Sequence, residues 1–174
     1  QLGHSGKNRN FDLKFSTSST KNRKQTLEET IKVIKDLYRL SNHKVQLLIE
    51  NQGSQTSKNV TIFDSTEELQ LLKKTVGERL KFNFNLAHAT LSGIDLNDSE
   101  VFQYVFKNSP FFEVSEIKRI YDSHLPLRPG NGRILQLIKN YKDLFKKRNV
   151  ILEYRNVHGS ELLKSFNFIN ETLA

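Results

Sequence analysis

The segment Leu80-Lys81-Phe82-Asn83-Phe84-Asn85 places two phenylalanines at period two between polar residues. This alternation is typical of a β-strand with one buried face. A helical pattern lies on each side of it. Ser65 and Glu68 have the spacing of a capping box before an apolar stripe, and Asn97 and Glu100 have the same spacing further on. The segment is therefore predicted to be a strand between two helices.

The same order recurs along most of the chain. Further strands are predicted at 44–50, 116–121 and 149–154, and apolar stripes predict helices at 26–40, 65–76, 97–105, 133–147 and 160–173. Strands that alternate with helices form parallel sheets, because parallel strands need a crossover connection. The chain is therefore expected to have an α/β fold.

The spacing of the strand ends points to a barrel. Glu50, Asn85, Arg119 and Glu153 follow one another at intervals of about 35 residues, the length of one βα unit. A (β/α)₈ barrel needs about 250 residues, so 174 residues provide about five units, with a short strand at 1–3. We therefore expect a single partial TIM-barrel domain over 1–174, made of C-terminal units. A preceding segment or a protein partner is expected to cover its open edge, because exposed sheet edges promote aggregation.

Composition limits the function classes. The chain has no cysteine, which excludes disulfides, thiolate metal sites and cysteine nucleophiles. Its 27 Lys and Arg against 19 Asp and Glu give a net charge of +8, which favours an anionic partner such as nucleic acid. A general bias of the source proteome towards basic residues is the alternative. No run of about 18 apolar residues occurs, so no membrane span is expected.

Much of the positive charge lies in a loop insertion predicted at 7–24. It has six basic residues against one aspartate, and it would lie on the face where a barrel carries its site. Mobile basic side chains there would contact phosphates by charge rather than by base sequence. The predicted partner is a nucleic acid, DNA in preference to RNA. The alternative is a solvated insertion with no ligand. The predicted nucleic-acid-binding residues are the six basic residues of this loop and one basic residue near a later strand end. They are Lys7, Arg9, Lys14, Lys21, Arg23, Lys24 and Arg119.

Polar side chains at the strand ends form a candidate site. Glu50 and Glu153 each end an apolar strand, Asn85 and His88 follow another, and His124 follows the third. Buried carboxylates are costly unless they bind a cation or pair with a base. Converging carboxylates and imidazoles suit a divalent metal ion. The alternative is that each residue caps a helix or pairs with a lysine.

Three phrases resemble the endonuclease IV-like proteins of AP endonuclease family 2, in the xylose isomerase-like barrel superfamily. Residues 47–53 (LLIENQG) resemble the family's L-E-N/T-x-x-G, and 84–95 (FNLAHATLSGID) resemble L-D-T-x-H-x-x-x-x-G-x-D. Residues 130–134 (GNGRI) resemble G-x-G-x-I. The resemblance implies a TIM barrel that cleaves DNA at abasic sites with three zinc ions.

The resemblance also identifies departures from the family's ligand set. Glu50, His88 and Glu153 match ligands, whereas Gln1, Asn85, Arg119 and Pro126 stand where ligands are expected. A three-zinc site is therefore not expected. At most one ion, zinc or manganese, is predicted at Glu50, His88 and Glu153, with His124 as a weak fourth ligand. Glu50 and Glu153 are the predicted catalytic residues, because related sugar isomerases use two glutamates around one ion.

Three functions follow as hypotheses. The first is a nucleic-acid-binding protein derived from an endonuclease IV-like repair enzyme, with weakened or lost phosphodiester cleavage. The second is a non-catalytic component of a nucleic-acid or ribonucleoprotein assembly. The third is a single-metal sugar-phosphate isomerase or epimerase, which needs a complete one-ion site.

Overall fold

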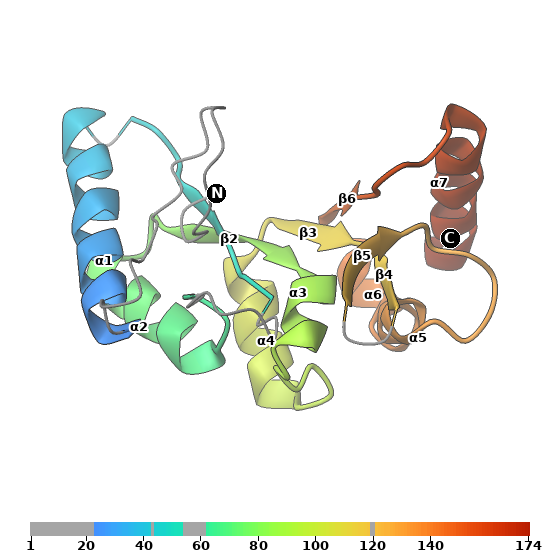
Figure 1. The fold of residues 1–174 in the computed structure, drawn as a ribbon, viewed down its shortest axis with the longest axis horizontal. Helices are drawn as coiled ribbons and strands as arrows, with labels where there is room; N and C mark the ends of the chain where they lie inside the picture. Colours follow the sequence, from blue (N-terminus) through green and yellow to red (C-terminus); the bar gives the residue numbers. More distant parts are fainter. Residues whose placement is uncertain (1–22, 43, 54–61, 119–120) are drawn as a thin grey trace.

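The computed structural model describes residues 23–42, 44–53, 62–118 and 121–174. Its centre is a four-stranded parallel sheet in the order β1-β2-β3-β6 (Figure 1). These strands are β1 Leu48–Glu50, β2 Lys81–Asn85, β3 Phe111–Val114 and β6 Asn149–Leu152. The α/β fold with parallel strands is thus confirmed, and so are the predicted strands around Glu50, Asn85 and Leu152.

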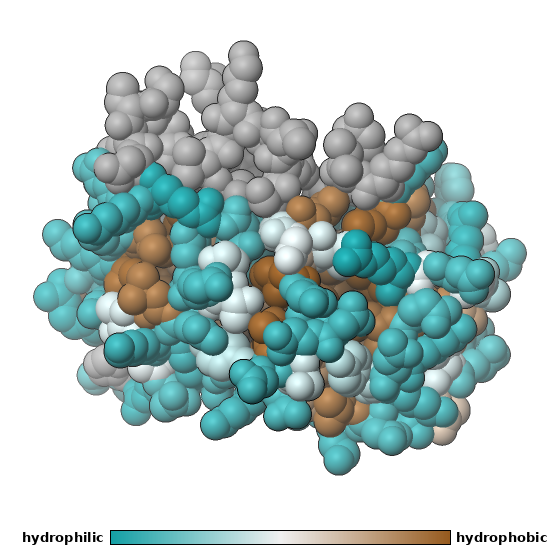
Figure 2. All heavy atoms as spheres, turned by 90° about the horizontal axis from the view of Figure 1, so that it is seen from below, coloured by the Kyte–Doolittle hydropathy of each residue, from teal (hydrophilic) through white to brown (hydrophobic). Residues whose placement is uncertain are grey.

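Helices connect the strands and pack around the sheet (Figure 1). In chain order they are α1 Arg23–Leu40, α2 Thr66–Val76, α3 Leu86–Leu91, α4 Ser99–Asn108, α5 Arg133–Asn140, α6 Lys142–Phe145 and α7 Gly159–Leu173. Hydrophilic side chains cover most of the molecular face in Figure 2, with apolar ones in small separate areas. No helix among the described residues has the length and apolar character that crossing a membrane requires.

The two faces of the sheet differ in chemistry because side chains alternate along a strand. Phe82, Phe84 and Phe112 are fully buried in the hydrophobic core. Asn83, Asn85 and Glu113 occupy the alternate positions of β2 and β3, and the register pairs Asn83 with Phe111 and Asn85 with Glu113. The opposite face of the sheet therefore carries polar groups at the carboxyl ends of the strands.

The strand predicted at 116–121 does not belong to the central sheet, so that prediction was wrong. The sheet strand is β3 Phe111–Val114, whereas β4 Glu116–Lys118 pairs antiparallel with β5 Tyr121–Leu125 in a separate two-stranded ribbon. The ribbon lies within the connection between β3 and β6, so the near-constant spacing of strand ends does not hold. Apolar residues at Ile117 and Ile120 gave the ribbon a strand pattern, and that pattern was assigned to the sheet.

The helix predictions need smaller corrections. Asp98, not Asn97, caps α4, and its carboxylate accepts hydrogen bonds from the backbone N–H groups of Glu100 and Val101. The helix predicted at 133–147 is interrupted at Tyr141 and becomes α5 and α6. Helix α3 was not predicted.

The N-terminal predictions fall almost entirely outside the described residues. These are the strand at 1–3, Gln1, Lys7, Arg9, Lys14 and Lys21. Arg23 and Lys24 are described, and they form the start of α1 rather than part of a loop. Arg119 also lies outside the described residues.

Candidate metal centre

Three glutamates from three strands meet at the carboxyl ends of the sheet. Glu50 ends β1, Glu113 lies in β3, and Glu153 directly follows β6. One carboxylate oxygen of each lies within 4.8 Å of those of the other two. All three side chains are partly buried. The predicted convergence of Glu50 and Glu153 is therefore observed, and Glu113 joins them.

Asn85 lies among these carboxylates. Its Nδ2 donates to Glu153 Oε2 at 2.7 Å, to Glu113 Oε2 at 3.1 Å and, more weakly, to Glu50 Oε1 at 3.4 Å. Its Oδ1 accepts from the backbone N–H of His88 at 3.0 Å and so caps α3. Asn85 therefore holds the three glutamates through one amide group.

Two histidines flank the cluster, and each contacts one glutamate. His88 Nδ1 lies 3.0 Å from Glu50 Oε1, and His124 Nδ1 lies 3.1 Å from Glu153 Oε2. The two imidazole rings meet edge to face, with their centroids 5.8 Å apart. Both side chains are buried. The histidines lie outside the group of three converging carboxylates, so the structure places them beside Glu50 and Glu153.

The surroundings move the pKa values of two glutamates in opposite directions. Burial, followed by the nearby charges of Glu50 and Glu153, raises the pKa of Glu113 to about 7, although hydrogen bonds from Asn83 and Asn85 oppose this. Burial also acts to raise the pKa of Glu153, but the hydrogen bond and charge of His124, with the charge of His88, outweigh it and lower that pKa. Near neutral pH the cluster thus contains an ionised Glu153 and a partly protonated Glu113.

The donor set fits one divalent cation. Three carboxylate oxygens that converge within 4.8 Å suit a hard or borderline divalent ion, and the adjacent imidazoles can orient the carboxylates. Among the described residues, Glu50, Glu113 and Glu153 are the group whose carboxylate oxygens converge closely enough to hold a metal ion.

Glu113 was missed by the sequence analysis because β3 was placed five residues too late. The signal that could have found it is a single carboxylate in the short apolar run Phe111-Phe112-Glu113-Val114. A charged residue in a buried strand needs a partner, as Glu50 and Glu153 do.

Arg23 has a structural role. Its guanidinium pairs with Asp64 and, at 2.6 Å, with Glu68 Oε1, so it joins the start of α1 to the start of α2. Glu68 also accepts from the backbone N–H of Phe63 at 2.7 Å. Arg23 therefore forms ion pairs with carboxylates of its own chain. Lys24, in contrast, is exposed.

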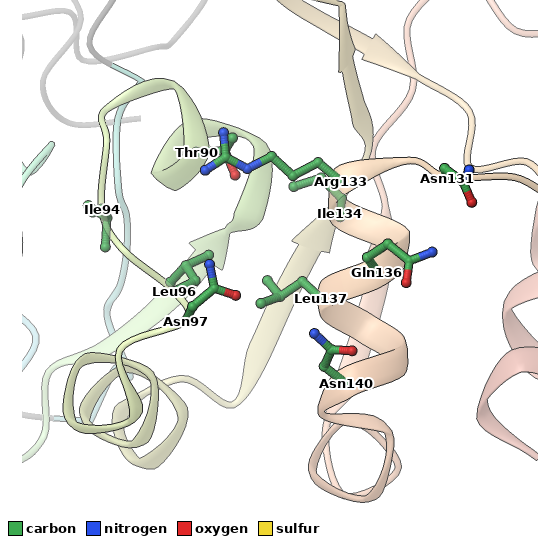
Figure 3. Close-up of a pocket in the computed structure, with 10 residues that line it drawn as sticks. All are labelled: Thr90, Ile94, Leu96, Asn97, Asn131, Arg133, Ile134, Gln136, Leu137 and Asn140. Atoms are coloured by element: carbon green, nitrogen blue, oxygen red, sulfur yellow. The ribbon is translucent and has the colours of Figure 1, made fainter.

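The structure also has a surface pocket of about 340 Å³, whose lining residues are drawn in Figure 3. It is bounded by α5 and by the chain between α3 and α4, with Leu96 and Leu137 among its apolar residues and Asn97, Gln136 and Asn140 among its polar ones. None of the three glutamates lines it.

Comparison with known proteins supports the fold. No family model matches the sequence, and no curated protein matches it either. A crystal structure of a D-tagatose 3-epimerase-like protein superposes with a TM-score of 0.68 at 16% identity, covering 86% of this chain and 55% of that one. The chain therefore has an α/β fold with parallel strands that matches part of a TIM barrel. It spans less than two thirds of the length of the structures it matches, as a partial barrel does.

Two further structures show the functional range of this fold. The probable 3-DHS dehydratase AsbF of Bacillus anthracis gives a TM-score of 0.64 at 18% identity, covering 88% of this chain and 59% of that one. An AP endonuclease of family 2 from Brucella melitensis gives 0.59 at 14% identity, covering 87% and 56%. The predicted barrel fold is thus supported, and the endonuclease IV-like assignment stays a proposal.

Proposed function

We propose that the chain provides a single-ion divalent metal site, held by Glu50, Glu113 and Glu153. The observation that carries this proposal is the convergence of three carboxylates from three separate strands within 4.8 Å. Carboxylates this close repel one another unless a cation, a proton or a hydrogen-bond donor compensates their charge. A bound divalent ion would supply that charge and would polarise an oxygen of a substrate.

The reaction class that this site favours is isomerisation or epimerisation of a small sugar or sugar phosphate. Such reactions move a proton to and from a carbon next to a carbonyl group, which requires a base and an acid on the same site. Glu153 would accept the proton through a carboxylate oxygen, and the imidazole of His124, whose Nδ1 lies 3.1 Å from Glu153 Oε2, would take it up and return it. The D-tagatose 3-epimerase-like structure is consistent with this class.

The second candidate is nucleic-acid binding with weakened or lost cleavage at abasic sites. Its support is the net charge of +8, the basic residues at 7–24 and the fold shared with an AP endonuclease of family 2. A non-catalytic scaffold would use the same basic residues without a metal ion.

One set of assays separates these candidates. The 174-residue protein with Mn²⁺ is incubated with ketohexoses and their phosphates in D₂O, and proton exchange is followed by NMR. A duplex that contains an abasic site is tested in parallel for cleavage and binding. We expect deuterium incorporation into a sugar that Glu153→Gln abolishes and the exposed control Glu171→Gln retains. Abasic-site cleavage without sugar exchange would overturn the isomerase proposal.

A further inference from the structure

Asn85 is fixed at its backbone by a second buried asparagine. Asn51 Oδ1 accepts from the backbone N–H of Asn85 at 2.7 Å, and Asn51 Nδ2 donates to the backbone carbonyl of Asn85 at 3.0 Å. Both residues are fully buried. This pair of hydrogen bonds holds Asn85 at the point where β2 ends and α3 begins.

The orientation of the Asn85 amide is fixed as well. The backbone N–H of His88 can only donate, so the atom that accepts from it at 3.0 Å must be Oδ1. The NH₂ group consequently faces the other way, towards the glutamates. Rotating the amide by half a turn would remove the cap of α3 and place two donors against each other.

The NH₂ group has two hydrogens and three carboxylate neighbours, Glu50, Glu113 and Glu153. Its positive end partly offsets the repulsion among them, without adding a charge. It contacts one oxygen of each of the three carboxylates, and an oxygen that accepts from Asn85 has one lone pair fewer to offer to a cation.

We propose that Asn85 is a positioning residue that clamps the three glutamates in the metal-free protein and competes with a divalent ion for their oxygens. This inference rests on the proposed metal site. Aspartate at this position would cap α3 equally well and would replace the competing donor with a fourth carboxylate oxygen. The affinity of carboxylate sites for divalent cations rises with the number of charged ligands.

The test compares Asn85→Asp, Asn85→Ser and the exposed control Asn167→Asp in the full chain. Mn²⁺ affinity is measured by isothermal titration calorimetry, and metal-free stability by urea unfolding in EDTA. We expect Asn85→Asp to bind Mn²⁺ at least about tenfold more tightly than the wild type and Asn167→Asp to match the wild type. Serine caps a helix but has no amide, so Asn85→Ser should lose stability in EDTA.

A double-mutant cycle separates the clamp from a merely structural role. At pH 8.5, Glu113→Gln removes one negative charge from the cluster, so it should restore part of the stability that Asn85→Ser loses. Additive effects would overturn the clamp, and so would equal Mn²⁺ affinities of the wild type and Asn85→Asp. If neither protein binds Mn²⁺, the proposed metal site fails, and the cycle alone decides for or against the clamp.

Discussion

His124 Nδ1 lies 3.1 Å from Glu153 Oε2, and the His124 backbone has a φ of 44°. This left-handed conformation is uncommon for residues other than glycine, although asparagine adopts it readily. We therefore predict that His124→Asn preserves the backbone but removes the imidazole. Burial would then act on Glu153 unopposed by His124, and its pKa would rise. A ¹³C NMR titration of labelled glutamate carboxyl groups measures this, and an unchanged Glu153 pKa would show that His124 does not hold the carboxylate ionised.

The raised pKa of Glu113 predicts a pH dependence of metal-free stability. The folded pKa of about 7 lies above the ordinary value of 4.5, so the folded state binds more protons between these values. The contribution of Glu113 to stability is fully present below pH 4.5 and is lost as pH rises to about 7. In EDTA, the free energy of unfolding should therefore fall between pH 5 and pH 8 relative to Glu113→Gln. Parallel pH profiles of the two proteins would contradict the raised pKa.

Gly132 is predicted to be intolerant of a side chain because Glu116 occupies the space beside it. A Cβ at Gly132 would overlap the Glu116 carboxylate, which accepts from the backbone N–H of Leu135 at 2.9 Å at the start of α5. Gly132→Ala should displace Glu116 and lower the free energy of unfolding by about 1 kcal/mol. Gly159→Ala is the matched control, since a Cβ there meets nothing within 4 Å. Equal stability of both variants would show that the Glu116 cap is dispensable.

Arg23 and Lys24 are neighbours in α1, but only the substitution of Arg23 is expected to destabilise the fold. Arg23→Ala leaves the buried Asp64 without its guanidinium partner and should lower the free energy of unfolding by about 1–2 kcal/mol. Lys24→Ala changes an exposed side chain and should stay within about 0.5 kcal/mol of the wild type. Urea unfolding compares the two. A stable Arg23→Ala protein would mean that the α1–α2 ion pairs contribute nothing.

Nucleic-acid binding is tested by its salt dependence. If the basic residues at 7–24 contact phosphates, replacing Lys14, Lys21 and Lys24 with alanine should flatten the plot of log K against log salt by up to about three units. Arg23 is kept in this variant because of its ion pairs with Asp64 and Glu68. Fluorescence anisotropy with a labelled duplex gives the slopes. An unchanged slope would mean that these lysines do not contact phosphates.

The parallel sheet could be predicted from patterns within short segments of the sequence. The alternating phenylalanines lie in β2, and the capping box at Ser65 begins α2, as expected. The prediction failed at β3, where the ribbon of β4 and β5 carries its own strand pattern. Periodicity within a segment does not reveal which strand joins which sheet. That choice depends on packing between distant segments.

The site was predicted where a polar residue directly follows an apolar strand, as Glu50 and Glu153 do. Glu113 was missed because its strand, β3, was placed too late in the chain, and its partners Asn83 and Asn85 lie on a neighbouring strand about 30 residues away. The clamp formed by Asn85 was also missed. The sequence showed Asn85 only as a polar residue that follows a strand, and only the folded sheet brings the three carboxylates to its amide.

The most direct test of the metal site is a titration of the full chain with Mn²⁺ at pH 8, followed by calorimetry, for the wild type and Glu113→Gln. Glu113 is chosen because the observed group of three carboxylates contains it and the site expected from the sequence does not. Glu171→Gln provides the exposed control. The three-glutamate site predicts one Mn²⁺ per chain, with affinity lowered at least about tenfold by Glu113→Gln and unchanged by Glu171→Gln. Absence of binding by the wild type, or equal binding by the wild type and Glu113→Gln, would contradict it.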